Sequence, residues 1–381
     1  MRIRFKKRYI VIAALNAVSL IGTAVLTAVG GSMAGSQSYN YAAERWKGDS
    51  DLDYSQISCF FSDDAGFSTD SLNSVKSQFL SELETVSISP EEGIGLITDA
   101  YSAPLGKEQV RTDGVGRSDA EVTAVGGDFF FFRDFRLESG AFFRKDDVMQ
   151  DGAVIDRTLA WNLYGSDDVA GMDIYINDVK LYIAGVIDLP DNDAEEQCIG
   201  DTPRAYISYE SAALIAPEYD GDYGMGEDYS YTPSFRRINC YEYVMPEKVS
   251  DFAENCADKI FGETYDGKID VVVNSGRFSP SKRAKAFKKL YKTAVRSDAV
   301  RYPYWENASR IVEFRLSYIY GLRKLTYVIP VLTALWLVIK GWMFLRRNKS
   351  RIKDFAGRCA EKLRMKIKRR KNKVPGTAES Q

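Results

Sequence analysis

Two long apolar runs lie near the two ends of the chain. Residues 9–31 contain no charged side chain, and most positions are Ile, Val, Leu or Ala. At about 1.5 Å of rise per residue, a helix of this length spans the roughly 30 Å hydrocarbon core of a bilayer. The second run, residues 325–345, contains the single charge Lys340, which lies close to Arg346 and Arg347. A lysine near a helix end can extend to the membrane surface. The pattern predicts two transmembrane helices, over 9–31 and 325–345.

The first run has an alternative interpretation as a cleaved signal peptide. Small residues follow it at Ser32 to Gly35 and could form a cleavage site. The apolar core of a signal peptide is usually about 7–15 residues, which is shorter than this run, so a retained helix is the main prediction. In the second run, Pro330 predicts a kink or the point at which the helix leaves the membrane surface.

Between the apolar runs, the pattern predicts two separated β-α-β units. In the first, residues 55–103, two strands enclose a helix over 68–84 with apolar residues at three- and four-residue spacing. In the second, residues 236–280, two strands enclose a helix that opens on Pro246, a residue favoured in the first helical turn. We expect the two units to join as one split domain.

The stretch between these units, about 104–235, alternates apolar and polar positions over short segments separated by turn residues. It predicts a small, mostly β subdomain inserted into the split fold, with residues 129–132 as a buried strand. Residues 281–324 have a helical pattern that runs into the second apolar run as a stalk. The predicted class is therefore α+β, with two transmembrane helices flanking an extracytoplasmic split β-α-β domain (36–280) that carries a β-rich insert.

The charge distribution predicts the topology. Residues 1–8 have a net charge of +5 and residues 346–381 a net charge of +11, so the overall −2 requires −18 between them. Basic residues accumulate on the cytoplasmic side of membrane proteins. We therefore expect the basic N-terminus and the basic tail in the cytoplasm and the acidic centre outside. A chain with an acidic centre does not have the basic surface of a nucleic-acid-binding protein.

The composition excludes several chemistries. The chain has no histidine, which excludes Ser-His-Asp and Cys-His catalysis and His-ligated zinc. It has no phosphate-binding loop of the Gly-x-x-x-x-Gly-Lys-Ser/Thr type, so it carries no such ATPase site. We predict no enzyme activity and no catalytic, cofactor or metal residue. Acidic stretches at 188–196 and 220–228 could offer oxygen ligands to Ca²⁺, but neither has the EF-hand spacing, and solvated loops are the favoured interpretation.

Four of the five cysteines lie in the segment expected outside the membrane, where disulfides can form. Cys59 and Cys240 lie on the first strands of the two β-α-β units and are the favoured pair. Buried free thiols are the equally acceptable alternative. Cys359 falls in the cytoplasmic tail and is expected to be reduced.

The most informative motifs lie between residues 137 and 187. Leu163 and Tyr164 end a predicted helix, and Gly165 can adopt the left-handed conformation that follows many helices. Gly171 allows a tight entry into a strand, and Asn177-Asp178 fits a two-residue hairpin turn. The motif residues are, in order, Gly140, Phe142, Asp146, Leu163, Tyr164, Gly165, Gly171 and Gly185.

In order and spacing, these motifs resemble the periplasmic core domain of MacB-type ABC transporter permeases, the group that includes the FtsX-like and lipoprotein-releasing permeases. The resemblance covers roughly residues 1–345. It implies a permease-type subunit in the plasma (inner) membrane of a bacterium, used in export or mechanotransmission. The sequence departs from the family at Ala141, where an Arg is usual, and in having two predicted spans rather than four.

These departures imply partners. The resemblance implies a separate ABC ATPase, and the two spans imply a companion permease chain or a homo-oligomer. In the tail, a basic helix could dock on that ATPase or lie on anionic lipid through Phe355, Leu363, Met365 and Ile367. Retention of topology alone would also explain the tail charges. The alternative function is a membrane-anchored extracytoplasmic sensor or binding module for an envelope partner, without transport.

Overall fold

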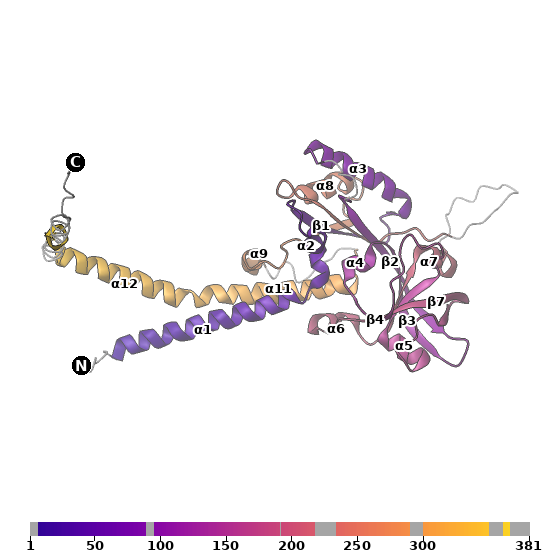
Figure 1. Ribbon diagram of the computed structural model, residues 1–381, viewed down its shortest axis with the longest axis horizontal. Coiled ribbons are helices and arrows are strands. Elements are labelled where there is room, and N and C mark those ends of the chain that lie inside the picture. Colours follow the sequence, from indigo (N-terminus) through magenta and orange to yellow (C-terminus); the bar gives the residue numbers. More distant parts are fainter. Residues whose placement is uncertain are drawn as a thin grey trace, which may run out of the picture. The chain divides into compact units, whose positions relative to one another are not determined.

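A computed structural model describes residues 7–88, 95–190, 192–217, 234–289, 300–349 and 361–365. The chain forms two compact units. One unit comprises residues 1–28 and 322–381, and the other comprises residues 29–321. Figure 1 shows the elements of both units along the chain.

The first unit is helical. It holds most of α1 (Lys7–Gly35), the end of α11 (Tyr304–Thr326) and all of α12 (Val328–Arg347). By length and composition, α1 and the run Tyr304–Arg347 are apolar and long enough to cross a membrane. Pro330 lies in the first turn of α12, where a missing backbone N–H costs little. The proline thus follows the junction between α11 and α12 and does not interrupt either helix.

Polar side chains join the two helical stretches within this unit. The Oγ1 atoms of Thr23 and Thr326 lie 2.7 Å apart, and Ser19 donates to the carbonyl of Thr326 at 2.5 Å. Two turns away, the Asn16 amide donates to the Thr333 hydroxyl at 3.0 Å. Small and hydroxyl residues of this kind allow close packing between helices in an apolar environment.

The second unit is built on a sheet whose ten described strands follow the order β10-β1-β9-β2-β3-β8-β5-β7-β4, with β6 paired to β2 and β7. The strands are β1 (Tyr54–Phe61), β2 (Thr98–Arg111), β3 (Arg117–Gly127), β4 (Arg136–Gly140), β5 (Gly152–Asp156), β6 (Asp173–Ile176), β7 (Val179–Asp188), β8 (Arg204–Ser208), β9 (Cys240–Pro246) and β10 (Ile269–Val273).

The two β-α-β units interleave in this sheet. Strand β1 lies between β9 and β10, and β9 lies between β1 and β2, with all three pairings antiparallel. The connecting helices α3 (Leu72–Thr85) and α8 (Phe252–Phe261) lie side by side next to β1 (Figure 1). Phe79 of α3 and Phe261 of α8 are buried in the same core. Segments almost 200 residues apart in sequence thereby form one layered half of the domain.

The stretch expected as a separate insert continues the same sheet. Strand β3 pairs with β2 along its whole length, from Arg117 to Gly127, and β8 then pairs in parallel with β3. The expected strand over 129–132 is also wrong, because α4 (Phe129–Arg133) is helical. Gly127, at φ +66°, ends β3, and the backbone carbonyl of Asp128 accepts the first bonds of the helix. The aromatic run is nevertheless largely buried, since Phe129 and Phe132 lie in the core.

The sheet has an apolar core on each face. Helices α3 and α8, together with α5 (Arg157–Tyr164) and α7 (Tyr209–Ile215), cover the first face. The second face is covered by η1 (Ser38–Tyr41), α2 (Ala42–Lys47), α4 and the start of α11. The second unit also contains the helices η2 (Thr69–Ser71), α6 (Asp193–Ile199), α9 (Pro280–Ala286) and η3 (Phe287–Lys289).

The favoured disulfide is absent from the structure. Cys59 and Cys240 are both free and buried, and Cys240 pairs in register with Phe60, the residue after Cys59. Because successive strand residues point to opposite faces, Cys59 lies in the first core and Cys240 in the second. Two thiols on opposite faces of a sheet cannot meet without rebuilding both strands.

Candidate functional site

A buried ion pair attaches helix α11 to the sheet. Arg277 follows β10 and is 3% exposed. Its Nη1 and Nη2 atoms donate to the two carboxylate oxygens of Glu306 at 2.8 Å each, and Nη2 also donates to Glu313 at 3.1 Å. A bidentate guanidinium–carboxylate pair fixes both orientation and distance. We call Arg277, Glu306 and Glu313 the Arg277 clamp.

The spacing of charges on α11 explains how the clamp forms. Residues 306, 310 and 313 are separated by four and three positions and therefore lie on one helix face. Arg310 donates to Glu306 at 2.6 Å and to Asp270 of β10 at 2.7 Å. The Tyr302 hydroxyl donates to the same Asp270 carboxylate at 3.0 Å. Alternating charges on one face thus bind the first turns of α11 to the edge strand of the sheet.

The pKa values of Arg277 and Glu313 are shifted within the clamp. Burial by itself lowers the pKa of Arg277, but the carboxylates of Glu306 and Glu313 outweigh burial, so its pKa is raised. Burial likewise acts to raise the pKa of Glu313, and the Arg277 guanidinium overcomes it, so that pKa is lowered. Both shifts favour the charged forms, so Arg277 and Glu313 stay ionised over the ordinary pH range.

A second buried arginine has a different environment. Arg133 at the end of α4 is 1% exposed and pairs with Glu242 of β9. Its guanidinium carbon lies 4.5 Å from the centre of the Trp305 ring, a distance typical of cation–π contact. The Nε and Nη1 atoms have no hydrogen-bond partner among the described residues. Burial lowers the pKa of Arg133, opposite to the shift of Arg277.

A chain of hydrogen bonds connects the two arginines. The Ser58 hydroxyl donates to Glu242 at 2.7 Å and accepts from the Asn274 amide at 2.7 Å. The side-chain oxygen Oδ1 of Asn274 in turn accepts from Arg277 Nη1 at 3.1 Å. This buried polar network crosses β9, β1 and the end of β10, below the segments that cover the second face. Polar groups linked in this way in a low-dielectric interior specify one arrangement of the elements that carry them.

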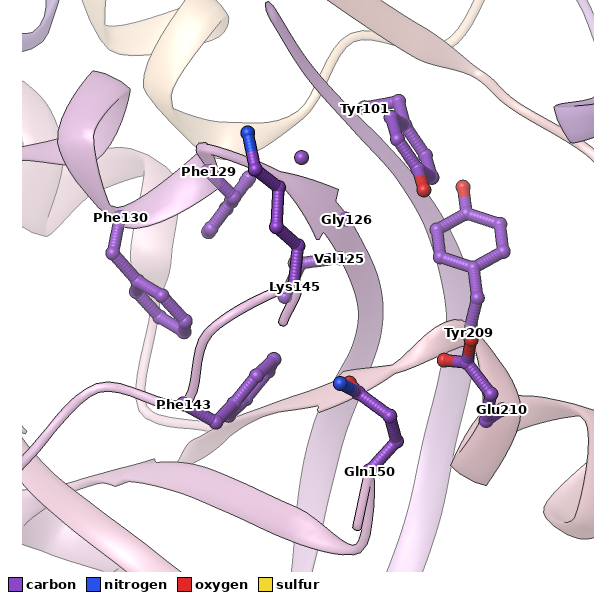
Figure 2. A pocket seen from close by; sticks show the side chains of 11 residues that line it. Tyr101, Val125, Gly126, Phe129, Phe130, Phe143, Lys145, Gln150, Tyr209 and Glu210 are labelled. Atoms are coloured by element: carbon purple, nitrogen blue, oxygen red, sulfur yellow. The ribbon is translucent and has the colours of Figure 1, made fainter. Parts of the chain in front are cut away.

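A small hollow lies next to Phe129 and Phe130, at the start of α4. It has a volume of about 70 Å³ and is lined by aromatic rings. Figure 2 shows Tyr101 and Tyr209 together on one side, Phe130 and Phe143 on the other, and Lys145 between them. The ring centres of Tyr101 and Tyr209 are 5.0 Å apart. The hollow has room for a few water molecules but not for an organic ligand.

The glycines of the sequence motifs are close-packing positions. Gly140 of β4 and Gly185 of β7 are register partners. A Cβ atom added at Gly140 would lie 2.2 Å from the carbonyl oxygen of Ala184, and one added at Gly185 would lie 2.6 Å from that of Ala141. Gly140 also has φ +75°, a conformation that side chains rarely adopt. These two motif glycines therefore allow β4 to approach β7.

The other motif residues also shape the fold. Gly165, at φ +69°, donates to the Trp161 carbonyl and ends α5, as predicted, and Gly171, at φ +85°, donates to Ile183. Leu163 is buried, and the Tyr164 hydroxyl donates to the Asp173 carbonyl.

Phe142 and Asp146 occupy less enclosed positions. Phe142 stacks on Phe130 with ring centres 4.6 Å apart, and Asp146 is exposed. The motif positions thus shape strands, turns and packing, and the structure does not gather them around one cavity.

The tail positions lie mostly outside the described residues. Phe355 and Ile367 fall outside them, as does Cys359. Leu363 and Met365 are described and are 62% and 61% exposed. The acidic stretch 220–228 is also outside the described residues, and the part of the chain that the structure does describe holds no group of three His, Cys, Asp or Glu side chains able to bind a metal ion.

Sequence reasoning missed the buried polar network. One available signal was the spacing of charges at 306, 310 and 313 on a helix that also carries buried apolar residues. A second was Glu242 inside the apolar strand β9, where every residue is buried. Their partners Arg133 and Arg277 are distant in sequence and lie in a short helix and a turn. No local pattern connects them.

Comparison with known proteins identifies the family. The model of the MacB-like periplasmic core domain matches residues 10–235. Among solved structures, the extracellular domain of the noncanonic ABC-type transporter YknZ from Gram-positive bacteria is 12% identical, with a TM-score of 0.37 over 57% of this chain and 99% of that one. The periplasmic region of MacB from Actinobacillus actinomycetemcomitans is 15% identical, with a TM-score of 0.36 over 58% and 89%.

No curated protein matches the chain. The family match alone covers more than half of the residues and includes all the glycine motifs from Gly140 to Gly185. By this match, the chain belongs to the family of proteins with a MacB-like periplasmic core domain, found in bacterial ABC transporter permeases of the inner membrane.

Proposed function

We propose that this protein is a permease-type subunit that couples a separate cytoplasmic ABC ATPase to its own extracytoplasmic domain. In this proposal α1 and α12 cross the inner membrane, and both basic ends lie in the cytoplasm. The family match supports the subunit type, and the positive charge at both ends supports the topology. The protein has no catalytic role of its own in this proposal, and the ATPase supplies the energy.

The Arg277 clamp is the observation that carries the coupling role. Tyr304–Arg347 is a single helical run with a short junction, and it is apolar enough over its second part to cross a membrane. Its first turns carry Glu306, which Arg277 holds in a buried bidentate pair. In this proposal, a force on α11 acts on the edge of the sheet through this buried ion pair.

The proposed partners follow from the family, which implies an ATPase and further permease chains in general. The permease partner in this proposal is a companion chain or a second copy of this chain. The tail, with the exposed Leu363 and Met365, is proposed to contact the ATPase or anionic lipid.

Purification from the native membrane tests the proposal. The tagged full chain is extracted in mild detergent, and the proteins that co-purify are quantified by mass spectrometry. We expect an ABC ATPase in near-stoichiometric amount, and less of it with Leu363→Ser/Met365→Ser at equal membrane level of the chain. Repeated recovery of the chain with envelope proteins but without an ATPase would instead support the sensor or binding module.

Coupling itself is tested on the recovered complex. Limited proteolysis of the extracytoplasmic domain is compared with and without ATP. We expect the wild-type pattern to change with ATP, and the change to be lost in Glu306→Gln/Glu313→Gln while ATPase recovery stays the same. Arg315→Gln is the matched control, because Arg315 lies on the same helix but pairs with Asp193 at the surface. An ATP response that survives in the clamp variant would refute coupling through the clamp.

A further inference from the structure

A cleft opens on the second face of the sheet beside the start of α11. Its volume is about 410 Å³, within the range of roughly 300–1,000 Å³ that small-molecule sites occupy. The floor is formed by neighbouring strands, with Ser102 of β2, Thr123 of β3 and Arg204 of β8. The segment from Arg301 to Trp305 forms a wall. The cleft is therefore enclosed both by the sheet and by the chain that leads into helix α11.

Three residues that line this cleft carry buried polar atoms without hydrogen-bond partners among the described residues. Trp305 is 5% exposed, and its indole Nε1 has no hydrogen-bond partner among the described residues. The same holds for the side-chain amide oxygen Oδ1 of Asn239, a residue that is 7% exposed, and for Nε of Arg204. Buried polar groups are nearly always hydrogen-bonded in folded proteins, since an unsatisfied one costs about 1–3 kcal/mol. Two donors and one acceptor at one cleft indicate that something else satisfies them.

The charges around the cleft favour an anion. Arg204, Arg237 and Arg301 line it, against the carboxylates of Asp63 and Glu121. Arg204 forms no ion pair with the described part of the chain, and its guanidinium lies 4.3 Å from the centre of the Tyr304 ring. The side chain of Arg301 is 84% exposed, and its Nε atom lies 3.8 Å from the Oδ2 atom of Asp63. Guanidinium groups bind carboxylate and phosphate oxygens in a bidentate manner.

We propose that this cleft binds a small organic oxyanion, a carboxylate or phosphate joined to an aromatic or aliphatic body that also carries a hydrogen-bond donor. Arg204 and Arg301 hold the oxyanion, Trp305 donates a further hydrogen bond, and Asn239 accepts from the donor of the ligand. The body packs on Pro104, Leu105 and the ring of Tyr302. The site goes beyond the coupling role, and its test needs no ATPase, so either proposal can fail while the other stands.

The position of the cleft gives a bound molecule access to the clamp. Tyr302 lines the cleft and donates to Asp270, which also accepts from Arg310. Arg310 in turn bonds Glu306. A ligand that orders Tyr302 therefore touches the same contacts that hold α11 to the sheet. Contiguous contacts of this kind are a physical route for coupling between two sites.

The test measures binding of defined probes to the full chain in detergent. The probes are 4-hydroxyphenylacetate, its neutral analogue 4-hydroxyphenylacetamide, and phenyl phosphate. Their binding is measured by calorimetry and by ligand-observed NMR. We expect saturable binding of at least one of the two anions, at least tenfold tighter than the neutral amide. The tighter of the two anions identifies the ligand as a carboxylate or a phosphate.

Three variants locate the site. Arg204→Met should weaken binding of the anion at least tenfold, and Arg301→Gln about threefold, since that exposed side chain is more hydrated. Arg117→Gln makes the same charge change at an exposed position on β3 that does not line the cleft and should leave binding unchanged. Because Arg301 is mostly exposed, Arg301→Gln is expected to fold even if Arg204→Met does not. No saturable binding of either anion up to 10 mM, equal binding of acid and amide, or full binding in both cleft variants would overturn the proposal.

Discussion

The motif region around β4 and β7 and the polar network around Arg277 are built on opposite principles. In the motif region, glycines remove side chains so that backbones can approach, as at Gly140 and Gly185. In the network, large charged side chains are buried and paired. The family match at 10–235 includes the first region, while Arg277, Glu306 and Glu313 lie beyond it. The match therefore includes the close glycine contacts of the fold, whereas the clamp that holds α11 to the sheet lies outside it.

The largest expected effect tests the network. Arg277→Met removes the buried cation that joins Glu306 and Glu313, and leaves Glu306 with Arg310 and Glu313 with Arg283. Breaking a buried pair by removing one partner costs about 3–5 kcal/mol of the free energy of unfolding, and the remaining arginines place the expected loss at the lower end of that range. Chemical unfolding of the full chain in detergent measures this loss. Arg315→Met removes a surface partner on the same helix and should cost less than about 1 kcal/mol. Equal losses in the two variants would show that the clamp is no more important than a surface pair.

The next effect tests the motif region. Gly140→Ala places a Cβ atom 2.2 Å from a backbone oxygen and forces a left-handed conformation, which together should cost about 3 kcal/mol. Gly165→Ala has the same conformational strain with open space around it and should cost about 1–2 kcal/mol. The unfolding midpoints of the two variants separate close approach from conformation. If both variants lose the same free energy of unfolding, the close approach of β4 and β7 does not depend on the absence of a side chain at Gly140.

A third prediction concerns pH in the motif region. Burial raises the pKa of Asp156 to about 6, although the Leu159 and Arg204 amides donate to its carboxylate. The folded state therefore binds this proton more tightly than the unfolded state, whose pKa is near 3.8. Protonation of Asp156 therefore stabilises the folded state. This stabilisation is fully present below about pH 4 and is lost as pH rises to about 6, which changes the free energy of unfolding by about 2–3 kcal/mol.

Asp156→Asn should remove that dependence while keeping one acceptor for the start of α5. The difference between unfolding midpoints at pH 4.5 and pH 7 measures it in both proteins. An unchanged difference in the variant would show that Asp156 does not titrate in this range. Arg277 and Glu313 should behave differently here, because the shifts of their pKa values favour the charged forms.

The smallest expected effect tests whether the two arginine sites act as one. Ser58→Ala removes the hydroxyl between Glu242 and Asn274 and should cost about 1–2 kcal/mol. Ser77→Ala, at an exposed position of α3, should change stability by less than about 0.5 kcal/mol. A double-mutant cycle between Arg133→Met and Arg277→Met sharpens the result. Additive losses in the wild type, as in the Ser58→Ala background, would mean that the two sites are independent.

The sequence by itself determined the elements whose causes are local. The lack of charge over 9–31 agrees with an apolar helix at α1, and the helix spacing of apolar residues over 68–84 agrees with α3. The helix predicted to open on Pro246 begins later, because Pro246 is the last residue of β9 and α8 starts at Phe252. The turn chemistry was also predictable. Asn177 and Asp178 both have positive φ between β6 and β7, and Gly165 ends α5 as expected. Backbone conformation depends on the residue and its neighbours, so short patterns are sufficient for it.

Only the tertiary structure decided which strands meet and which charges pair. Cys240 lies opposite Phe60 and not opposite Cys59, and this offset of one residue places the two thiols on different faces of the sheet. No local pattern in the sequence predicts that register. The interleaving of β1 between β9 and β10 joins the two split halves, and the pairing of β3 with β2 adds the expected insert to the same sheet. The same interleaving brings Glu242, Ser58 and Asn274 together. Pairings between residues about 200 positions apart depend on the packing of the whole domain, and the buried network is a product of that packing.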